Sequence, residues 1–455
     1  MTTNTAPRDE SSVGAAPHKR SAIGTAMRVL TAITGSDVAE KYGLREPINR
    51  VAYEATKTGF KTLGAANRAF TQVSGGGKPS RPATSSKGYF DLNPDDEQAM
   101  IAETVKEFST EILRPAAYDA DAAANTPEDI LKRSAELGIT MINVPEELDG
   151  AATERCVVTN ALVAEAMAYG DMGLAVPLLA PSGVATTITN FGSDGQQRTY
   201  LPDYAGENVP TSAVVVAEPR PLFDAFDLKT KATRVASGYR LDGVKSFVPA
   251  AGSAELFIVG AQLDGRPALF IVESDTKGLS VEADPGMGLR AAGMGRLILE
   301  GVSVPSTALL GEVEGEAAEN AYRDVVRLSR LGWSALAVGT ATAMLDYVVP
   351  YVNEREAFGE PISNRQAVAF MVANIATEID GLRLVTLRGA SRAEQGLPFA
   401  REAALSRKLT IDKGLQIGLD GVQLLGGHGF TKEHPVERWY RDLRGAGIGE
   451  GIVVL

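Results

Sequence analysis

The sequence predicts an α+β protein in which two helical domains flank a central β domain. Helical apolar spacing runs through residues 89–210, short apolar runs fill 211–311, and helical spacing returns over 312–455. Short strands at regular intervals are typical of a small barrel or sandwich. We expect an N-terminal helical domain, a central β-barrel or sandwich domain and a C-terminal four-helix bundle, with an extra helical extension over 1–88.

The composition narrows the class of protein. A chain of 455 residues with 44% hydrophobic content is long enough for about three domains. Its net charge of −12 argues against a nucleic-acid partner. One cysteine and three histidines cannot form a disulfide or a typical structural zinc site, so we expect no metal. No secretory signal and no uninterrupted apolar run of about 18 residues is evident, so we expect a cytoplasmic protein.

The extension consists of a polar start, a basic helical part and a linker. Residues 1–18 are rich in Thr, Ser, Ala and Pro and should be disordered. From Ile23 to Phe70 apolar residues recur at helical spacing among many lysines and arginines. Such helices can contact anionic membranes, but the interspersed acids favour packing on the body or on a neighbouring subunit. Ser74–Ser80 is a glycine-rich linker.

The N-terminal helical domain shows start and stop signals. Asn93 can cap a first helix, because a proline and three acids follow it directly. Further helices are expected over Pro127–Leu137, Val157–Tyr169, Gly183–Asn190 and Gln196–Tyr204.

Short runs separated by glycine, aspartate and proline then predict a β domain. The expected strands are Ala213–Ala217, Lys229–Arg234, Tyr239–Leu241, Leu256–Ala261, Ala268–Val272 and Leu297–Leu299.

Two apolar stripes characterise the C-terminal region. Apolar residues from Val368 to Thr386 and from Leu405 to Val422 recur at spacings of three and four. The turn-forming segment Gln395–Pro398 lies between them. We expect two long helices that form an antiparallel hairpin within a bundle.

Glu450 is the candidate catalytic residue. It lies between Gly449 and Gly451, and apolar residues follow it. Glycines let the backbone approach a ligand closely, and a carboxylate walled by apolar groups suits a general base that takes a proton from carbon. The segment alone favours a glutamate in a surface loop, and the motifs in the rest of the chain reverse this preference.

Motifs along residues 89–450 resemble the acyl-CoA dehydrogenase family in order and spacing. They include Leu137-Gly138, Val144–Glu146, Glu165–Ala168, Ala217-Glu218-Pro219, Leu241–Lys245, Gly286–Arg290, Val302–Pro305, Arg355–Ile362, Gln423–Phe430, Pro435–Asp442 and Ile448–Gly451. The resemblance implies FAD and a homotetramer (or dimer). It also implies oxidation of an acyl-CoA to the trans-2-enoyl-CoA, with electrons passed to an electron-transfer flavoprotein.

The resemblance also implies roles for individual residues. Glu450 would be the base, and Arg330, Phe223 and Gly451 would contact the acyl-CoA. Ser329 stands where some relatives carry the base, and it has no basic power. His428, His434 and Trp439 would be structural. The residues implied in FAD binding are Val216, Ala217, Phe247 and Ile452 around the flavin, and Arg355, Phe358, Gln423 and Gly427 facing a neighbouring subunit's FAD. The alternative for Arg355 is a surface ion pair with Glu356 or Glu360.

The chain departs from the family pattern near the expected cofactor. Ala217 and Ile452 replace threonines, Arg220–Asp224 replaces a glycine-rich turn with a serine, and Phe247-Val248-Pro249 replaces Trp-Ile-Thr. Each lost hydrogen bond weakens binding by about 0.5–1.5 kcal/mol. Two alternatives therefore stay open: an acyl-CoA oxidase or nitroalkane oxidase on the same fold, and a non-catalytic binding subunit.

Overall fold

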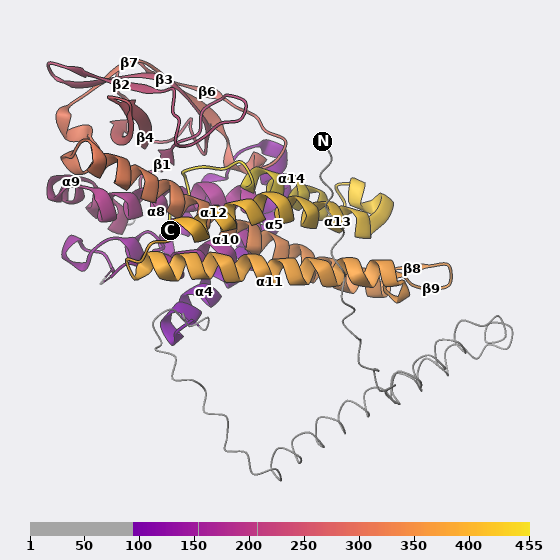
Figure 1. The fold of residues 1–455 in the computed structure, drawn as a ribbon. Helices are drawn as coiled ribbons and strands as arrows, with labels where there is room; N and C mark the ends of the chain where they lie inside the picture. Colours follow the sequence, from indigo (N-terminus) through magenta and orange to yellow (C-terminus); the bar gives the residue numbers. More distant parts are fainter. Residues whose placement is uncertain (1–93, 153, 207) are drawn as a thin grey trace, which may run out of the picture. The chain divides into compact units, whose positions relative to one another are not determined.

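The computed structural model describes residues 94–455 apart from 153 and 207 (Figure 1). The description that follows concerns these residues, which belong to one compact unit. The predicted basic extension, its linker and the proposed cap at Asn93 lie outside the described residues. The order of helical, β and helical domains is confirmed.

The N-terminal domain consists of helices closed by specific caps. The first of them begins after Asp95, whose carboxylate accepts a hydrogen bond from the amide of Gln98 at 2.8 Å. This Asp-x-x-Gln pair is a capping box, so the N-cap of this helix is Asp95 and not the predicted Asn93. The helices are α4 (Asp96–Phe108), α5 (Arg114–Ala123), α6 (Glu128–Glu136), α7 (Val157–Gly170), α8 (Met172–Phe191) and α9 (Asp194–Ala205). A short π-helix, Ser109–Leu113, joins α4 to α5.

Helix α8 is much longer than the predicted Gly183–Asn190. Asp171 caps it by accepting from the amide of Leu174 at 3.0 Å, and the helix continues through two prolines. Helices α8 and α10 (Glu316–Glu354) are both long and apolar enough to cross a membrane. However, 94% and 61% of their most apolar windows are buried inside the protein. Burial of this extent is typical of core helices.

The β domain is a seven-stranded half-barrel that packs beside α8 and α10 (Figure 1). Strand β1 pairs in parallel with β4, while β4–β5, β2–β3, β3–β7 and β6–β7 are antiparallel. The six predicted strand positions are occupied, and one strand, β6, escaped prediction because it is largely exposed. The strands are β1 (Ser212–Val215), β2 (Lys231–Val235), β3 (Gly238–Val248), β4 (Leu256–Leu263), β5 (Arg266–Glu273), β6 (Leu279–Ala283) and β7 (Gly295–Val304).

The C-terminal helical domain contains the predicted hairpin. Helix α11 (Gln366–Glu394) runs beside the pair α12 (Ala400–Leu409) and α13 (Leu415–Leu425), which are joined by a short π-helix (Figure 1). Helix α10 is the centre of the domain and includes the fully buried Trp333. The last helix is α14 (Val436–Ala446), and a small β8–β9 hairpin (Glu356–Ala357 and Glu360–Pro361) follows α10.

Candidate active site

Glu450 lies where the helical and β domains meet. It follows α14, and its side chain is 4% exposed. The carbonyl oxygen of the next residue, Gly451, accepts hydrogen bonds from Ser329 Oγ at 2.8 Å and from Trp333 Nε1 at 3.1 Å. The amide of Ile452 donates to the carbonyl oxygen of Val214 in β1 at 2.8 Å. Helix α10 and strand β1 together fix the loop that carries the carboxylate.

Two arginines, one from α10 and one from α12, contact the Glu450 carboxylate. Arg330 Nε lies 3.1 Å from both carboxylate oxygens and its Nη2 lies 2.8 Å from Oε1. Arg407 Nη2 lies 3.3 Å from the same Oε1. Glu450 is buried, and guanidinium groups contact its carboxylate in addition to the apolar residues that follow it in the chain. The resemblance implied that Arg330 binds acyl-CoA, and in this structure its partner is Glu450.

The four residues implied around the flavin lie at the ends of β1 and β3 and beside Glu450. Val216 and Ala217 follow β1, and Ser246 in β3 donates its amide hydrogen to the carbonyl oxygen of Ala217 at 3.0 Å. Phe247, next in β3, packs 5.7 Å from the Trp333 ring. Ile452 joins the group through its bond to β1. Residues far apart in sequence thus surround one junction.

Positive φ angles accumulate at this junction. Phe247 has φ 60° and Ile452 has φ 67°, and Gly451 between Glu450 and Ile452 has φ 75°. A β-branched residue such as Ile452 rarely adopts this conformation, which costs on the order of 1–3 kcal/mol. Strained backbone retained at a buried junction of three segments points to a functional site.

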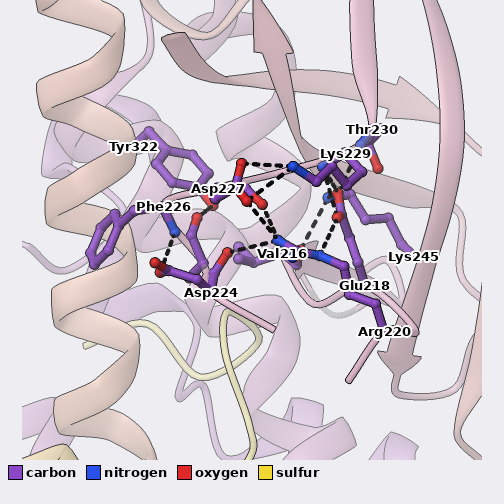
Figure 2. Close-up of polar contacts among 11 residues, drawn as sticks. Val216, Glu218, Arg220, Asp224, Phe226, Asp227, Lys229, Thr230, Lys245 and Tyr322 are labelled. Carbon is purple, nitrogen blue, oxygen red and sulfur yellow. Dashed lines mark hydrogen bonds and ion pairs between the residues drawn. The ribbon is translucent and has the colours of Figure 1, made fainter. Parts of the chain in front are cut away.

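A charged network replaces the expected glycine-rich turn after β1 (Figure 2). Lys245 is fully buried and donates to Glu218 at 3.1 Å and to the carbonyl oxygen of Val216 at 3.0 Å. Glu218 also accepts from the amides of Lys229 and Thr230 at 2.8 Å. The side chains of this network thus order the loop between β1 and β2 without the flexible glycines.

Opposing effects act on the pKa values of the buried pair. Burial favours the neutral form of Glu218, but Lys245 and the amides of Thr230 and Lys229 outweigh it and hold its pKa below the ordinary value. Burial lowers the pKa of Lys245 to about 8, against the attraction of Glu218. The Glu218 carboxylate therefore stays charged at neutral pH, while the Lys245 ammonium loses its proton at a pH just above neutral.

Aromatic rings of the same loop stack on arginines. The Arg220 guanidinium lies 5.3 Å from the ring centroid of Phe223, which the resemblance implied in substrate contact. The Phe226 ring lies 5.2 Å from Arg323 and 5.1 Å from Arg330. Phe226 thereby supports the arginine that holds Glu450. Phe226 and Arg407 had not been expected at the site, and no motif indicated them. Lys245 ends the motif Leu241–Lys245, but no role at the site had been assigned to it.

The resemblance implied that four residues contact the FAD of a neighbouring subunit, and all four lie on the surface: Arg355, Phe358, Gln423 and Gly427. Phe358 and Gly359 both have positive φ, 58° and 85°, and form the two-residue turn between β8 and β9. The turn displays the Phe358 ring at 93% exposure. Arg355, Gln423 and Gly427 are also exposed.

A tyrosine connects the segment that contains Arg355 with the segment that contains Gln423 and Gly427. Tyr351, near the end of α10, donates to the carbonyl oxygen of Leu425 at the end of α13 at 3.4 Å. Glu360 pairs with Arg365 at 3.5 Å, and within residues 94–455 as described no acidic side chain pairs with Arg355. The surface ion pair considered for Arg355 is therefore not found there, and its guanidinium is free to bind an anion.

Of the three residues expected to be structural, Trp439 and His434 are packed in the protein, while His428 is exposed. Trp439 is fully buried, and His434 Nδ1 lies 2.6 Å from the Tyr347 hydroxyl. His428, Glu433 and His434 bring three ligand-type atoms within 4.8 Å of one another. The expectation that no metal binds stays a prediction.

Comparison with known proteins agrees with this arrangement. Three family models match in order: "Acyl-CoA dehydrogenase, N-terminal domain" over 95–208, "middle domain" over 213–302 and "C-terminal domain" over 321–452. The fold and the buried site define a flavoprotein oxidoreductase. Since the three matches together span most of the chain, it belongs to the acyl-CoA dehydrogenase family.

Individual relatives share most of the chain. An acyl-CoA dehydrogenase of Bacillus subtilis (strain 168) is 31% identical over 79% of this chain and 96% of its own length. Butyryl-CoA dehydrogenase from Megasphaera elsdenii is 28% identical, with a TM-score of 0.72 over 80% and 97% of the two chains. A glutaryl-CoA dehydrogenase from Mycobacterium smegmatis, solved in complex with FADH2, has the same fold at 24% identity, with a TM-score of 0.69 over 78% and 90%.

Proposed function

We propose that this protein is an FAD-dependent acyl-CoA dehydrogenase that oxidises an acyl-CoA thioester to the trans-2-enoyl-CoA, with Glu450 as the base. The observation that carries the proposal is a buried carboxylate held between α10, α12 and β1, beside the residues implied in flavin binding. Glu450 removes the α-proton, and the bound FAD supplies the acceptor for the β-hydrogen, which leaves as hydride.

A backbone donor for the thioester is present in the same loop. Within the described residues, the amide N–H of Glu450 donates to no other residue, although this residue is buried. Unpaired buried amides are rare, and such an amide is available to a ligand. We propose that it polarises the thioester carbonyl as negative charge develops on the oxygen, a contribution typically of about 2.7–4 kcal/mol.

The residues present fit FAD in two places. Val216, Ala217, Phe247 and Ile452 surround the junction next to Glu450 and offer mainly backbone groups and apolar walls. Arg355 and Phe358 are exposed and offer a guanidinium for phosphate and a ring for stacking. We propose that this second set binds the FAD of a neighbouring subunit in a homotetramer.

The remaining partners follow from the same proposal. Electrons from the reduced flavin would pass to an electron-transfer flavoprotein, and the enzyme would act in the cytoplasm. Slow reoxidation of the reduced flavin by oxygen would support this acceptor, whereas fast reoxidation would favour an acyl-CoA oxidase.

One observation favours a non-catalytic binding subunit as a second candidate. The carboxylate of Glu450 is engaged by Arg330 through both of its oxygens, so it is not free to act as a base in this arrangement. Together with the lost hydroxyls at Ala217 and Ile452, this engagement would suit a relative that has lost its reaction.

An anaerobic absorbance titration with acyl-CoA thioesters of several lengths separates the candidates. The dehydrogenase should bind FAD, and its flavin absorbance should bleach with a suitable acyl-CoA. Glu450→Gln should keep FAD and lose bleaching, while the exposed control Glu316→Gln should behave as wild type. A colourless protein that takes up no FAD would support the binding subunit, and unchanged bleaching in Glu450→Gln would show that another base operates.

A further inference from the structure

Arg407 reaches from α12 to the segment that carries Glu450. Its Nη1 donates to the carbonyl oxygens of Gly449 at 2.6 Å and Ala446 at 3.4 Å, and its Nη2 lies 3.3 Å from Oε1 of Glu450. Its side chain is 15% exposed. Arg407 therefore fixes the backbone before Glu450, just as α10 fixes the backbone after it.

The site holds more positive than negative charge. The charged groups that face Glu450 are Arg330 from α10 and Arg407 from α12. The charges of Glu450 and Arg330 also act on the Tyr322 hydroxyl of α10. Within the described residues, Glu450 is the acid that pairs with Arg407. Burial lowers the pKa of Arg407, and Glu450 acts in the opposite direction. Two guanidinium groups thus share one carboxylate.

The two arginines hold Glu450 in different ways. Arg330 contacts both carboxylate oxygens and no backbone atom of the loop, whereas Arg407 contacts one oxygen and two backbone carbonyls. A carboxylate that takes a proton from a substrate must free at least one oxygen from Arg330. The backbone bonds of Arg407 do not depend on where the carboxylate points.

We propose that Arg407 is a positioning residue for Glu450. It keeps the loop in place and a positive charge beside the carboxylate while the carboxylate exchanges Arg330 for the substrate. This inference rests on the proposed function of Glu450 as the base, and no motif in the sequence indicates it.

A double-mutant cycle in urea unfolding tests the contact without any cofactor or reaction. Arg407→Leu should lower the folding equilibrium constant in the wild-type background. In a Glu450→Gln background, the same substitution should lower this constant by a factor that is about threefold or more smaller. Equal losses in both backgrounds would mean that Arg407 does not act on the carboxylate, and the inference would be rejected.

The pH profile of flavin reduction tests the positioning role. Removing a positive charge beside a carboxylate favours its protonated form, so Arg407→Leu should move the acid limb of the rate profile to higher pH. The rate at neutral pH should fall about 10–100-fold through misplacement of the base. Arg407→Lys should retain the acid limb of the wild type, and the exposed Arg401→Leu on the same helix is the matched control.

A second variant keeps the test informative if Arg407→Leu does not fold. Arg407→Gln keeps a polar side chain without the charge, so it should fold and still shift the acid limb. An acid limb unchanged in both Arg407→Leu and Arg407→Gln would overturn the positioning role. Wild-type protein that binds FAD but is reduced by no acyl-CoA would refute the proposed function and this inference together, whatever the unfolding cycle gives.

Discussion

Ser329 Oγ donates a hydrogen bond across 2.8 Å to the carbonyl oxygen of Gly451, the residue that follows Glu450. Trp333, one helical turn further along α10, donates to the same oxygen at 3.1 Å. Both donors are fully buried. A serine at the position where some relatives carry a base therefore has a structural task, because it anchors the loop of the proposed base to the central helix.

Removal of the serine hydroxyl should loosen this anchor. Ser329→Ala leaves Trp333 as the remaining donor to Gly451, so we expect the free energy of unfolding to fall by about 0.5–1.5 kcal/mol. Urea unfolding followed by circular dichroism measures the change. The exposed Ser253, whose hydroxyl donates to its own turn at 3.2 Å, provides the control Ser253→Ala, which should be close to neutral. Equal losses in the two variants would contradict the anchor.

Gly449 should tolerate no side chain. A methyl group there would collide with the indole ring of Trp333, which has no space to move because it is fully buried. We expect Gly449→Ala to destabilise the protein by about 1–3 kcal/mol and to displace Glu450. Gly447→Ala is the matched control, since its methyl group would meet its nearest neighbours at 3.4 Å or more. Thermal unfolding should separate the two variants, and similar melting temperatures would be evidence against close packing of Trp333 on the loop.

The buried Lys245 should make stability depend on alkaline pH. Burial lowers its pKa to about 8, against an unfolded value of about 10.5. Between these values the unfolded chain binds more protons than the folded chain, so the contribution of Lys245 to the free energy of unfolding rises with pH. The full rise across this window should be on the order of 3 kcal/mol.

Comparison of wild type with Lys245→Met isolates this contribution. The difference between their unfolding free energies, measured in urea at several pH values from 7.5 to 10.5, should change in favour of wild type as pH increases. Lys229→Met removes an exposed lysine paired with Asp227 at 3.0 Å and should show no such change. Parallel curves for wild type and Lys245→Met would indicate that the ammonium is not affected by burial.

The exposed Arg355 should matter for cofactor retention and little for stability. Arg355→Ala removes the guanidinium proposed to bind a neighbouring subunit's FAD, and no described acidic partner is lost with it. We expect weaker FAD binding by about 1.5–3 kcal/mol, the range of a charged hydrogen bond, at nearly unchanged melting temperature. Fluorescence titration of apoprotein with FAD measures it, with Arg401→Ala as the exposed control. Equal FAD affinity in both variants would remove Arg355 from the cofactor site.

The spacing of apolar residues predicted helices and strands well where one face of the element is buried. The hairpin of α11 with α12 and α13 follows directly from its apolar stripes, and most strands were found from their short apolar runs. The failures have physical causes. Helix α8 begins at Met172 because Asp171 caps it, and its near-continuous burial leaves no amphipathic pattern to read. Strand β6 is mostly exposed and carries little apolar signal.

The site was only partly predictable for a different reason. Glu450 was evident from its glycines and its motif, but its partners Arg330 and Arg407 come from two other helices. Phe226 and Lys245 likewise reach the site through tertiary packing. Such contacts depend on how helices and strands are placed in space, and one sequence does not encode that placement in any local spacing.

The pairing of Val215 in β1 with Gly451 has a consequence for how the protein folds. Almost the whole of the β domain and the C-terminal helical domain lies between these two residues, so their contact closes a very long loop. Closure of long loops is entropically unfavourable and tends to come late. The proposed base would then reach its position only after both domains have formed. Recovery of the site during refolding should lag behind recovery of helical structure, and incompletely folded chains would be unable to begin the reaction.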